Sequence, residues 1–317
     1  MKKVLRFALL IALSLLSIAL CFGVGELVAR MKYKPRKVYF SGSFEYHPIK
    51  KIALKKNYVG PDDSGNAAII TNSMGFRSAE IHQKKQPNEL RFAFIGDSIT
   101  YGHGVKDQDR FSNIFELNLT QACAEHLIST INTGVPGYSI KHEYQDLLSI
   151  SHLQPDVVFL QFTLNDLTEP FNFEKRLGGS GIDYHRVADT SFWHFYLSQR
   201  SALYLLANDL SKQIRFGTKN DTDIQQKAIA AEIMHSTELI NHPNDARQEK
   251  YWEEYLFWFD KFIQQCNKTN TACILVMSPY TFQLSLPLEN AYPQKRLEEH
   301  ARSKGMTVIN LLPVFQE

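Results

Sequence analysis

Short apolar runs alternate with longer amphipathic stretches from residue 89 onward. Apolar runs of roughly four to eight residues predict buried strands, and apolar positions repeating every three or four residues predict helices. The predicted strands are Arg91–Gly96, Ser129–Thr133, Asp156–Phe162, Ala272–Met277 and Thr307–Leu312. The predicted helices are Phe111–His126, Ile140–His152, a helix whose apolar face runs from Tyr251 to Cys266, and one through Arg296–Arg302.

This alternation predicts an α/β fold with a doubly wound, flavodoxin-like parallel sheet of five strands. The run Asp156–Phe162 is almost wholly apolar, which is typical of a strand buried on both faces. Ligands of such sheets bind outside the carboxyl ends of the strands, so we expect the chemistry there. Residues 167–245 break the rhythm, and we expect them to be an insertion near the mouth of the site.

The first segment is a candidate for membrane insertion. Phe7–Gly25 is uncharged and follows Lys2, Lys3 and Arg6, and as a helix it would span about 28 Å, close to the hydrocarbon thickness of a bilayer. We predict a cytoplasmic tail (1–6), a transmembrane signal anchor (7–25), a tether and docking segment (26–88) and a main domain (89–317) facing the periplasm or the exterior. The alternative is a protein secreted after cleavage near Gly23–Gly25.

Composition argues against nucleic-acid binding and against a metal site. The formal charge of +2 gives no general attraction to nucleic acid, so we expect no nucleic-acid partner. The four cysteines form no C-x-x-C pair and lie in no His-rich cluster, so we expect no metal site. Cys266 and Cys273 could pair in an oxidising compartment, but their apolar neighbours favour buried free thiols.

Gly96-Asp97-Ser98 directly follows the first predicted core strand. A serine in this place is displayed at the carboxyl end of the strand, where it can act as a nucleophile if a base and donors for the oxyanion lie nearby. The alternative is a serine that caps the following helix. Thr100 stands where a G-x-S-x-G elbow would have Gly, which argues against an α/β-hydrolase.

The next two predicted strands are followed by residues that could supply those donors. Gly137 follows the second strand and Asn165 the third. A Gly can bring its backbone N–H close to a substrate, and an Asn amide can donate to the same developing negative oxygen. In isolation, an ordinary Gly-Pro-Gly loop and an Asn-Asp turn would explain them.

Together, Gly96-Asp97-Ser98, Gly137 and Asn165 resemble the first three sequence blocks of the SGNH (GDSL-type) hydrolases, which are esterases, lipases and acyl-transfer enzymes. The resemblance covers about residues 71–316, and Asn72–Arg77 is similar to membrane-anchored bacterial members. It implies that Ser98 is the nucleophile, that the Ser98 and Gly137 N–H groups and the Asn165 side chain form an oxyanion hole, and that no cofactor is needed.

Two departures from the family pattern stand out. Thr163 occupies the position where the third block usually has Gly. The fourth block, Asp-x-x-His after the last strand, does not occur in the sequence, so the general base is unassigned and we expect the chain to be truncated before its final loop and helix. Six other histidines are candidate bases, and we expect each to be a structural or surface residue: His103, His142, His152, His185, His194 and His300.

The leading hypothesis is a membrane-anchored serine esterase or acyl-transfer enzyme that forms an acyl-enzyme at Ser98 and acts on an acylated small molecule, glycan or lipid. The alternative is a catalytically inactive SGNH-like module that binds a glycan or lipid without the Asp-x-x-His base. A flavodoxin-like anion-binding domain using Gly96–Thr100 is the weakest hypothesis, since no P-loop Lys accompanies that segment.

Overall fold

The structure is a computed structural model that describes residues 2–32, 42–61, 68–168, 192–216 and 233–317, apart from 235 and 244. Much of the expected insertion at 167–245, including His185, lies outside these residues. The side chain of His194 is likewise not described.

The main sheet contains five parallel strands, as the sequence predicted, and their order is β6-β5-β7-β8-β9. Its strands are β5 (Glu89–Ile95), β6 (Leu127–Asn132), β7 (Val157–Phe162), β8 (Ala272–Met277) and β9 (Thr307–Asn310). The described helices of this domain are α2 (Ser98–Tyr101), α3 (Phe111–Ala122), α4 (Ile140–Ile150), α5 (Asn165–Thr168), α9 (Ala246–Thr269), α10 (Tyr292–Ser303) and α11 (Leu312–Gln316).

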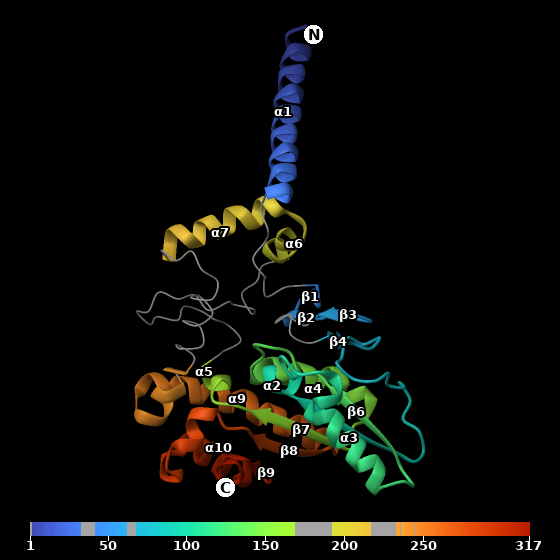
Figure 1. Cartoon of the computed structure of the whole chain (residues 1–317), viewed down its shortest axis with the longest axis vertical. Helices are drawn as coiled ribbons and strands as arrows, with labels where there is room; N and C mark the ends of the chain where they lie inside the picture. The colour runs from blue at the N-terminus through green and yellow to red at the C-terminus, as the bar shows by residue number, and fades with distance from the viewer. Residues whose placement is uncertain are drawn as a thin grey trace.

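Helices cover both faces of this sheet (Figure 1). Alternate side chains of each strand point to opposite faces, and the apolar side chains on both faces pack against helices. Ala93, Ile95 and Leu160 pack in the main core with residues of α4, α9 and α10. Phe94 points the other way and contacts Phe115 of α3 at 5.3 Å between ring centroids. The two-sided packing explains why the strands read as nearly continuous apolar runs.

Several elements end earlier than the sequence pattern indicated. The helix α3 ends at Ala122 rather than His126, and β9 ends at Asn310 rather than Leu312. At the second boundary the Asn310 side chain accepts a hydrogen bond from the Leu312 N–H at 3.1 Å, and α11 starts there. Local side-chain capping of this kind competes with the strand ladder and is hard to read from apolar periodicity.

The segment before the main sheet forms two antiparallel pairs, β1 (Phe44–His47) with β2 (Lys51–Leu54) and β3 (Val59–Pro61) with β4 (Ala68–Ile70). A second apolar core joins them to the main domain: Phe44, Ile52, Leu54, Ile69, Tyr101, Val135, Tyr138 and Phe195. The Tyr138 hydroxyl also donates to the Ile52 carbonyl at 2.6 Å. These strands therefore rest on the loop that follows β6.

The N-terminal helix α1 (Lys2–Lys32) extends away from the domain (Figure 1). Its stretch from Lys3 to Lys32 is long and apolar enough to cross a membrane, judged by length and composition. The described helices α6 (Phe192–Arg200) and α7 (Ala202–Phe216) lie near its C-terminal end.

The prediction of free thiols at Cys266 and Cys273 is wrong, because the structure joins them in a disulfide. Cys266 lies near the end of α9 and Cys273 lies in β8, and a tight turn between the two elements brings their Cα atoms to 6.2 Å. That separation is within the range that disulfides span. The apolar neighbours that suggested free thiols are equally compatible with a disulfide between these two cysteines.

We predict that alkylation of the denatured but unreduced protein modifies two of its four cysteines, Cys21 and Cys123, and that reduction exposes the other two. Intact-mass measurement after alkylation counts the modified thiols. Four modified thiols before reduction, in protein recovered from its native compartment, would contradict the pairing.

Candidate active site

The buried carboxylate of Asp97 is at the centre of the candidate site. Asp97 is 1% exposed and caps α2, since its Oδ1 accepts from the Ile99 N–H at 2.9 Å. Burial raises the pKa of this carboxyl, while the hydrogen bonds from its neighbours oppose the rise. The capping role proposed as the alternative for Ser98 therefore belongs to Asp97.

Ser98 is the first residue of α2 and is half-buried. Its Oγ lies 3.5 Å from Asp97 Oδ2, at the limit of a hydrogen bond. The carboxyl end of β5 thus displays the hydroxyl, as the sequence predicted for a nucleophile.

Asp97 also connects Ser98 to the residues after β7. Its Oδ2 accepts from the Asn165 Nδ2 at 3.0 Å and from the Thr163 Oγ1 at 3.4 Å. An amide nitrogen carries two hydrogens, so the bond to Asp97 orients the Asn165 side chain without using all of its donor capacity. The structure therefore brings Ser98 and Asn165 together around one carboxylate.

Thr163 fits the position where the resembled family has Gly. Its φ is not in the left-handed region, so the backbone does not require Gly there. Its N–H donates to Asp166 Oδ2 at 2.8 Å and its hydroxyl contacts Asp97. The β-branched residue thus takes part in the hydrogen-bond network.

The loop after β6 carries Gly137 to the same edge of the sheet. Gly137 has φ +79°, a conformation that favours Gly. Gly134 lies so close to α2 that a Cβ there would be 2.2 Å from the Tyr101 backbone nitrogen. The Val135 N–H also bonds to the Gly96 carbonyl at 3.4 Å. The loop therefore docks directly against the segment that carries Ser98.

Two buried acids on α4 were missed by the sequence analysis. Glu143 and Asp146 are both 0% exposed, and Asp146 forms a 2.5 Å salt bridge with Lys50 of the β1–β2 turn. Neither oxygen of Glu143 has a hydrogen-bond partner among the residues that the structure describes. Burial, followed by the charges of Asp97 and Asp146, raises the pKa of Glu143 well above its usual value. The sequence signal was present, because both acids share the helix face of Ile140, Leu147 and Ile150.

The described histidines differ in their surroundings. The buried His142 accepts the Ser139 N–H at its Nδ1 (3.2 Å) and stacks on Tyr138, and burial lowers its pKa well below the usual value. His300 bonds to Asp260 Oδ1 at 2.7 Å, between α10 and α9. His103 is exposed, and its backbone N–H donates to the Ser98 carbonyl at 3.1 Å. His142 thus has a structural role at the start of α4.

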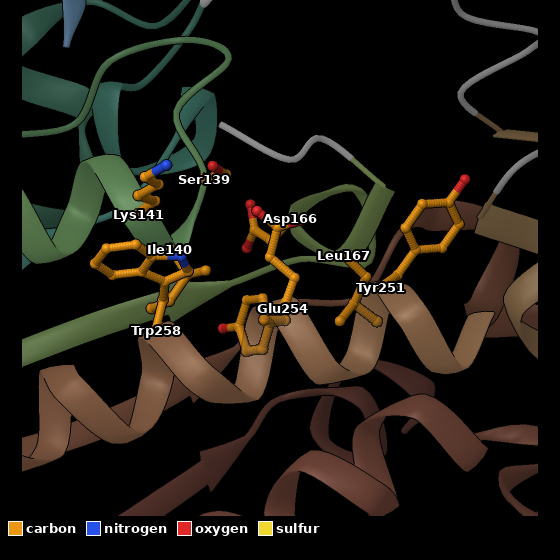
Figure 2. A pocket seen from close by; sticks show the side chains of 9 residues that line it. Ser139, Ile140, Lys141, Asp166, Leu167, Tyr251, Glu254 and Trp258 are labelled. Carbon is orange, nitrogen blue, oxygen red and sulfur yellow. The ribbon is translucent and has the colours of Figure 1, made fainter. Parts of the chain in front are cut away.

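A pocket lies between three elements: the N-terminus of α4, the short helix α5 and the helix α9 (Figure 2). Ser139 and Asp166 line it, and they are near neighbours in sequence of Gly137 and Asn165. Trp258 and Glu254 of α9 form much of the opposite wall, and Lys141 Nζ lies 5.2 Å from the Trp258 ring centroid. The pocket combines an aromatic surface with charged groups of both signs.

Comparison with known proteins gives matches among solved structures alone. No protein-family model matches the chain, and no curated protein matches it. An alpha/beta hydrolase enzyme from the metagenome of Lake Arreo, Spain, is 13% identical, with a TM-score of 0.40 over 74% of this chain and 81% of that one. An acetylxylan esterase from Geobacillus stearothermophilus is 14% identical, with a TM-score of 0.36 over 74% and 81%.

An SGNH-hydrolase family esterase is 10% identical, with a TM-score of 0.36 over 71% of this chain and 77% of that one. At these scores and identities the likeness carries no argument about activity, so the functional proposal depends on the residues of the site.

We predict that Asp97→Asn and Asp97→Ala have different effects. Asp97→Ala removes the helix cap and unpairs the Asn165 amide, and it should cost about 2–4 kcal/mol in unfolding free energy. Asp97→Asn keeps the shape of the side chain and one accepting oxygen. In either orientation, however, its NH₂ group faces a donor, the Ile99 N–H or the Asn165 Nδ2, so one hydrogen bond is lost. Its stability loss should be smaller, measured by urea unfolding. Equal losses for the two variants would contradict a hydrogen-bonding role.

We predict that Glu143→Gln stabilises the protein at neutral pH. A raised pKa means that the folded state holds the proton more tightly, so wild-type stability falls as pH rises from the ordinary value of 4.5 to the folded pKa. Each unit of the shift corresponds to about 1.4 kcal/mol. Urea unfolding at several pH values should show a shallower decline for the variant.

The exposed Glu125→Gln is the matched control and should leave the wild-type pH dependence unchanged. A Glu143→Gln protein that is less stable than wild type at neutral pH would show that the carboxylate itself is needed.

Proposed function

We propose that this protein is a membrane-anchored serine esterase or acyl-transfer enzyme of the SGNH type, with Ser98 as its nucleophile. The observation that carries the proposal is the shared carboxylate of Asp97, which lies 3.5 Å from the Ser98 hydroxyl and 3.0 Å from the Asn165 amide. A nucleophile and a polar donor are thereby held at adjacent strand ends, as acyl transfer requires.

In the proposed reaction, the Ser98 Oγ attacks the carbonyl carbon of an ester and gives up its proton to a general base. The Ser98 and Gly137 N–H groups and the Asn165 amide stabilise the negative oxygen of the tetrahedral intermediate. Collapse breaks the bond to the carrier alcohol, which takes the proton, and leaves an acyl group on Ser98. Water or a second alcohol then accepts the acyl group. We assign no histidine of this sequence to the base.

The pocket beside Asp166 supports an acylated carrier as the substrate class. Its Trp258 ring offers an apolar surface, and Glu254 and Lys141 offer hydrogen-bond acceptors and donors. Such a mixture suits a polar ring or headgroup with one apolar face. We propose that this pocket receives the alcohol side of the ester.

The disulfide between Cys266 and Cys273 supports a location outside the cytoplasm. Disulfides persist in the periplasm and the extracellular space and are rare in the reducing cytosol. With α1 as an anchor, the proposed arrangement places the catalytic domain on the outer side of the membrane.

We predict that a fluorophosphonate labels Ser98 in the full-length protein extracted from its native membrane, and that Ser98→Ala abolishes labelling. Hydrolysis of p-nitrophenyl acetate should fall by a factor of about 10³ or more, because the nucleophile is gone. Peptide mapping identifies the labelled residue. The matched control is Ser303→Ala, an exposed serine of α10, which should leave both signals unchanged.

The alternative function, an inactive SGNH-like module that binds a glycan or lipid, makes the opposite prediction. It requires a full-length protein that resists labelling, shows no ester hydrolysis, and retains ligand affinity after Ser98→Ala. That combination of results would sink the esterase proposal.

A further inference from the structure

Two residues near the end of α1 hold the corner between α6 and α7. The Arg30 guanidinium donates to the Arg200 carbonyl at 2.7 Å, at the C-terminus of α6. One turn earlier, the Glu26 carboxylate accepts from the Ser201 hydroxyl at 2.8 Å and from the Ala202 and Leu203 N–H groups at 2.9 and 3.0 Å. A cation at a helix C-terminus and an anion at a helix N-terminus both match the helix dipoles.

Apolar contacts strengthen the same joint. Ala29 of α1 is 3% exposed, whereas the rest of the described helix is largely exposed. A Cβ on Gly25 would lie 3.3 Å from a Leu203 methyl carbon, so α7 packs closely against α1 at this point. Figure 1 shows α7 running across the end of α1 rather than along it. The direction of α7 is therefore set by α1.

The helix face that contacts α1 continues along α7 as an exposed apolar stripe. Leu203, Ala207, Leu210 and Ile214 follow one another at spacings of four, three and four residues, which places them on one side of a helix. Leu210 is 48% exposed and Ile214 is 86% exposed. Leu205, on the opposite side, is buried. Because Leu203 of this stripe contacts Gly25, the stripe lies on the side of α7 that meets α1.

The neighbouring α6 also carries exposed aromatic and cationic groups. Trp193 is 66% exposed and Tyr196 is 37% exposed. The Arg200 guanidinium lies 4.2 Å from the Tyr196 ring centroid, and Lys32 at the end of α1 is exposed. Trp and Tyr favour the boundary between headgroups and acyl chains, and cations favour the lipid phosphates.

We propose that α6 and α7 form a membrane-surface platform, with the stripe Leu203–Ile214 lying in the headgroup–acyl boundary of the bilayer that α1 crosses. This inference rests on the membrane-anchored part of the proposed function. The occupant is lipid, because the stripe is continuous with the apolar α1 and is bordered by interfacial aromatic residues and cations.

The platform also fixes how the catalytic domain meets the membrane. Phe195 of α6 is 5% exposed and belongs to the apolar core that contains Tyr138 and Val135 of the Gly137 loop. Tyr46 of β1 contacts the Phe192 ring at 5.4 Å. The packed path from α7 through α6 to this loop would hold the candidate site at one orientation relative to the bilayer surface, so that it could meet esters carried by lipids in the bilayer.

The test is nitroxide depth measurement on the full-length protein in phosphatidylethanolamine/phosphatidylglycerol vesicles. Cys21→Ala and Cys123→Ser remove the free thiols, and single labels are placed through Ile214→Cys, Leu210→Cys, Asn208→Cys or Leu16→Cys. Collisions with oxygen, which partitions into lipid, are compared with collisions with a water-soluble nickel chelate. Ile214 is highly exposed, so its replacement leaves the fold intact.

Labels at 214 and 210 should show an oxygen-to-nickel collision ratio several-fold above that at 208, which lies roughly 130° around the helix from the stripe. Their depth should be about 5–10 Å into the headgroup–acyl boundary. Nickel accessibility at 214 equal to that at 208 would overturn the platform, and so would exclusion of both reagents, which indicates a protein contact.

The label at position 16 reports the anchor separately. A lipid-embedded label at 16 combined with a water-exposed label at 214 would sink the platform and leave the anchor intact. Water exposure at both positions would sink the anchor and the platform together. None of these measurements depends on esterase activity, so the serine chemistry is tested independently.

Discussion

The carboxylate of Asp97 joins two parts of the molecule that lie far apart in the sequence. It caps the helix that begins at Ser98, and it accepts hydrogen bonds from Thr163 and Asn165 after β7. Burial makes its charge costly, so the carboxylate depends on these donors as much as they depend on it. The geometry of the candidate nucleophile and its oxyanion donor follows from this one group.

The buried acids around Asp97 lower the stability of the folded state, because burial and mutual repulsion disfavour their charged forms. The charges of Asp97 and Asp146 act on Glu143, whose oxygens have no hydrogen-bond partner in the described part of the chain. Lys50, from the turn between β1 and β2, forms a salt bridge with Asp146, with 2.5 Å between its Nζ and the Asp146 Oδ1. The hairpin before the main sheet thus neutralises charge beneath the Gly137 loop as well as covering apolar surface. Such arrangements are common where function constrains the choice of residue.

Helices α6 and α7, which we propose lie at the membrane surface, connect the N-terminal helix to the main domain. Helix α1 holds the α6–α7 corner through Glu26 and Arg30, and α6 reaches the core beneath Tyr138 through Phe195. Hydrogen bonds and apolar contacts therefore connect the proposed anchor to the proposed site. In the proposed arrangement, these contacts would hold the candidate site at one orientation relative to the bilayer.

The sequence by itself determined the five-stranded α/β fold and the strand ends that carry Ser98, Gly137 and Asn165, because buried strands and strand-end motifs are local patterns. Only the tertiary structure showed the disulfide, the hydrogen bonds of Asp97 and the surroundings of Glu143 and Asp146 on α4. Each depends on which elements pack together, and residues 97 and 165 meet only when β5 and β7 pair in parallel. Apolar periodicity shows that a helix face is buried, but the partners of a polar group on that face are set by contacts distant in sequence.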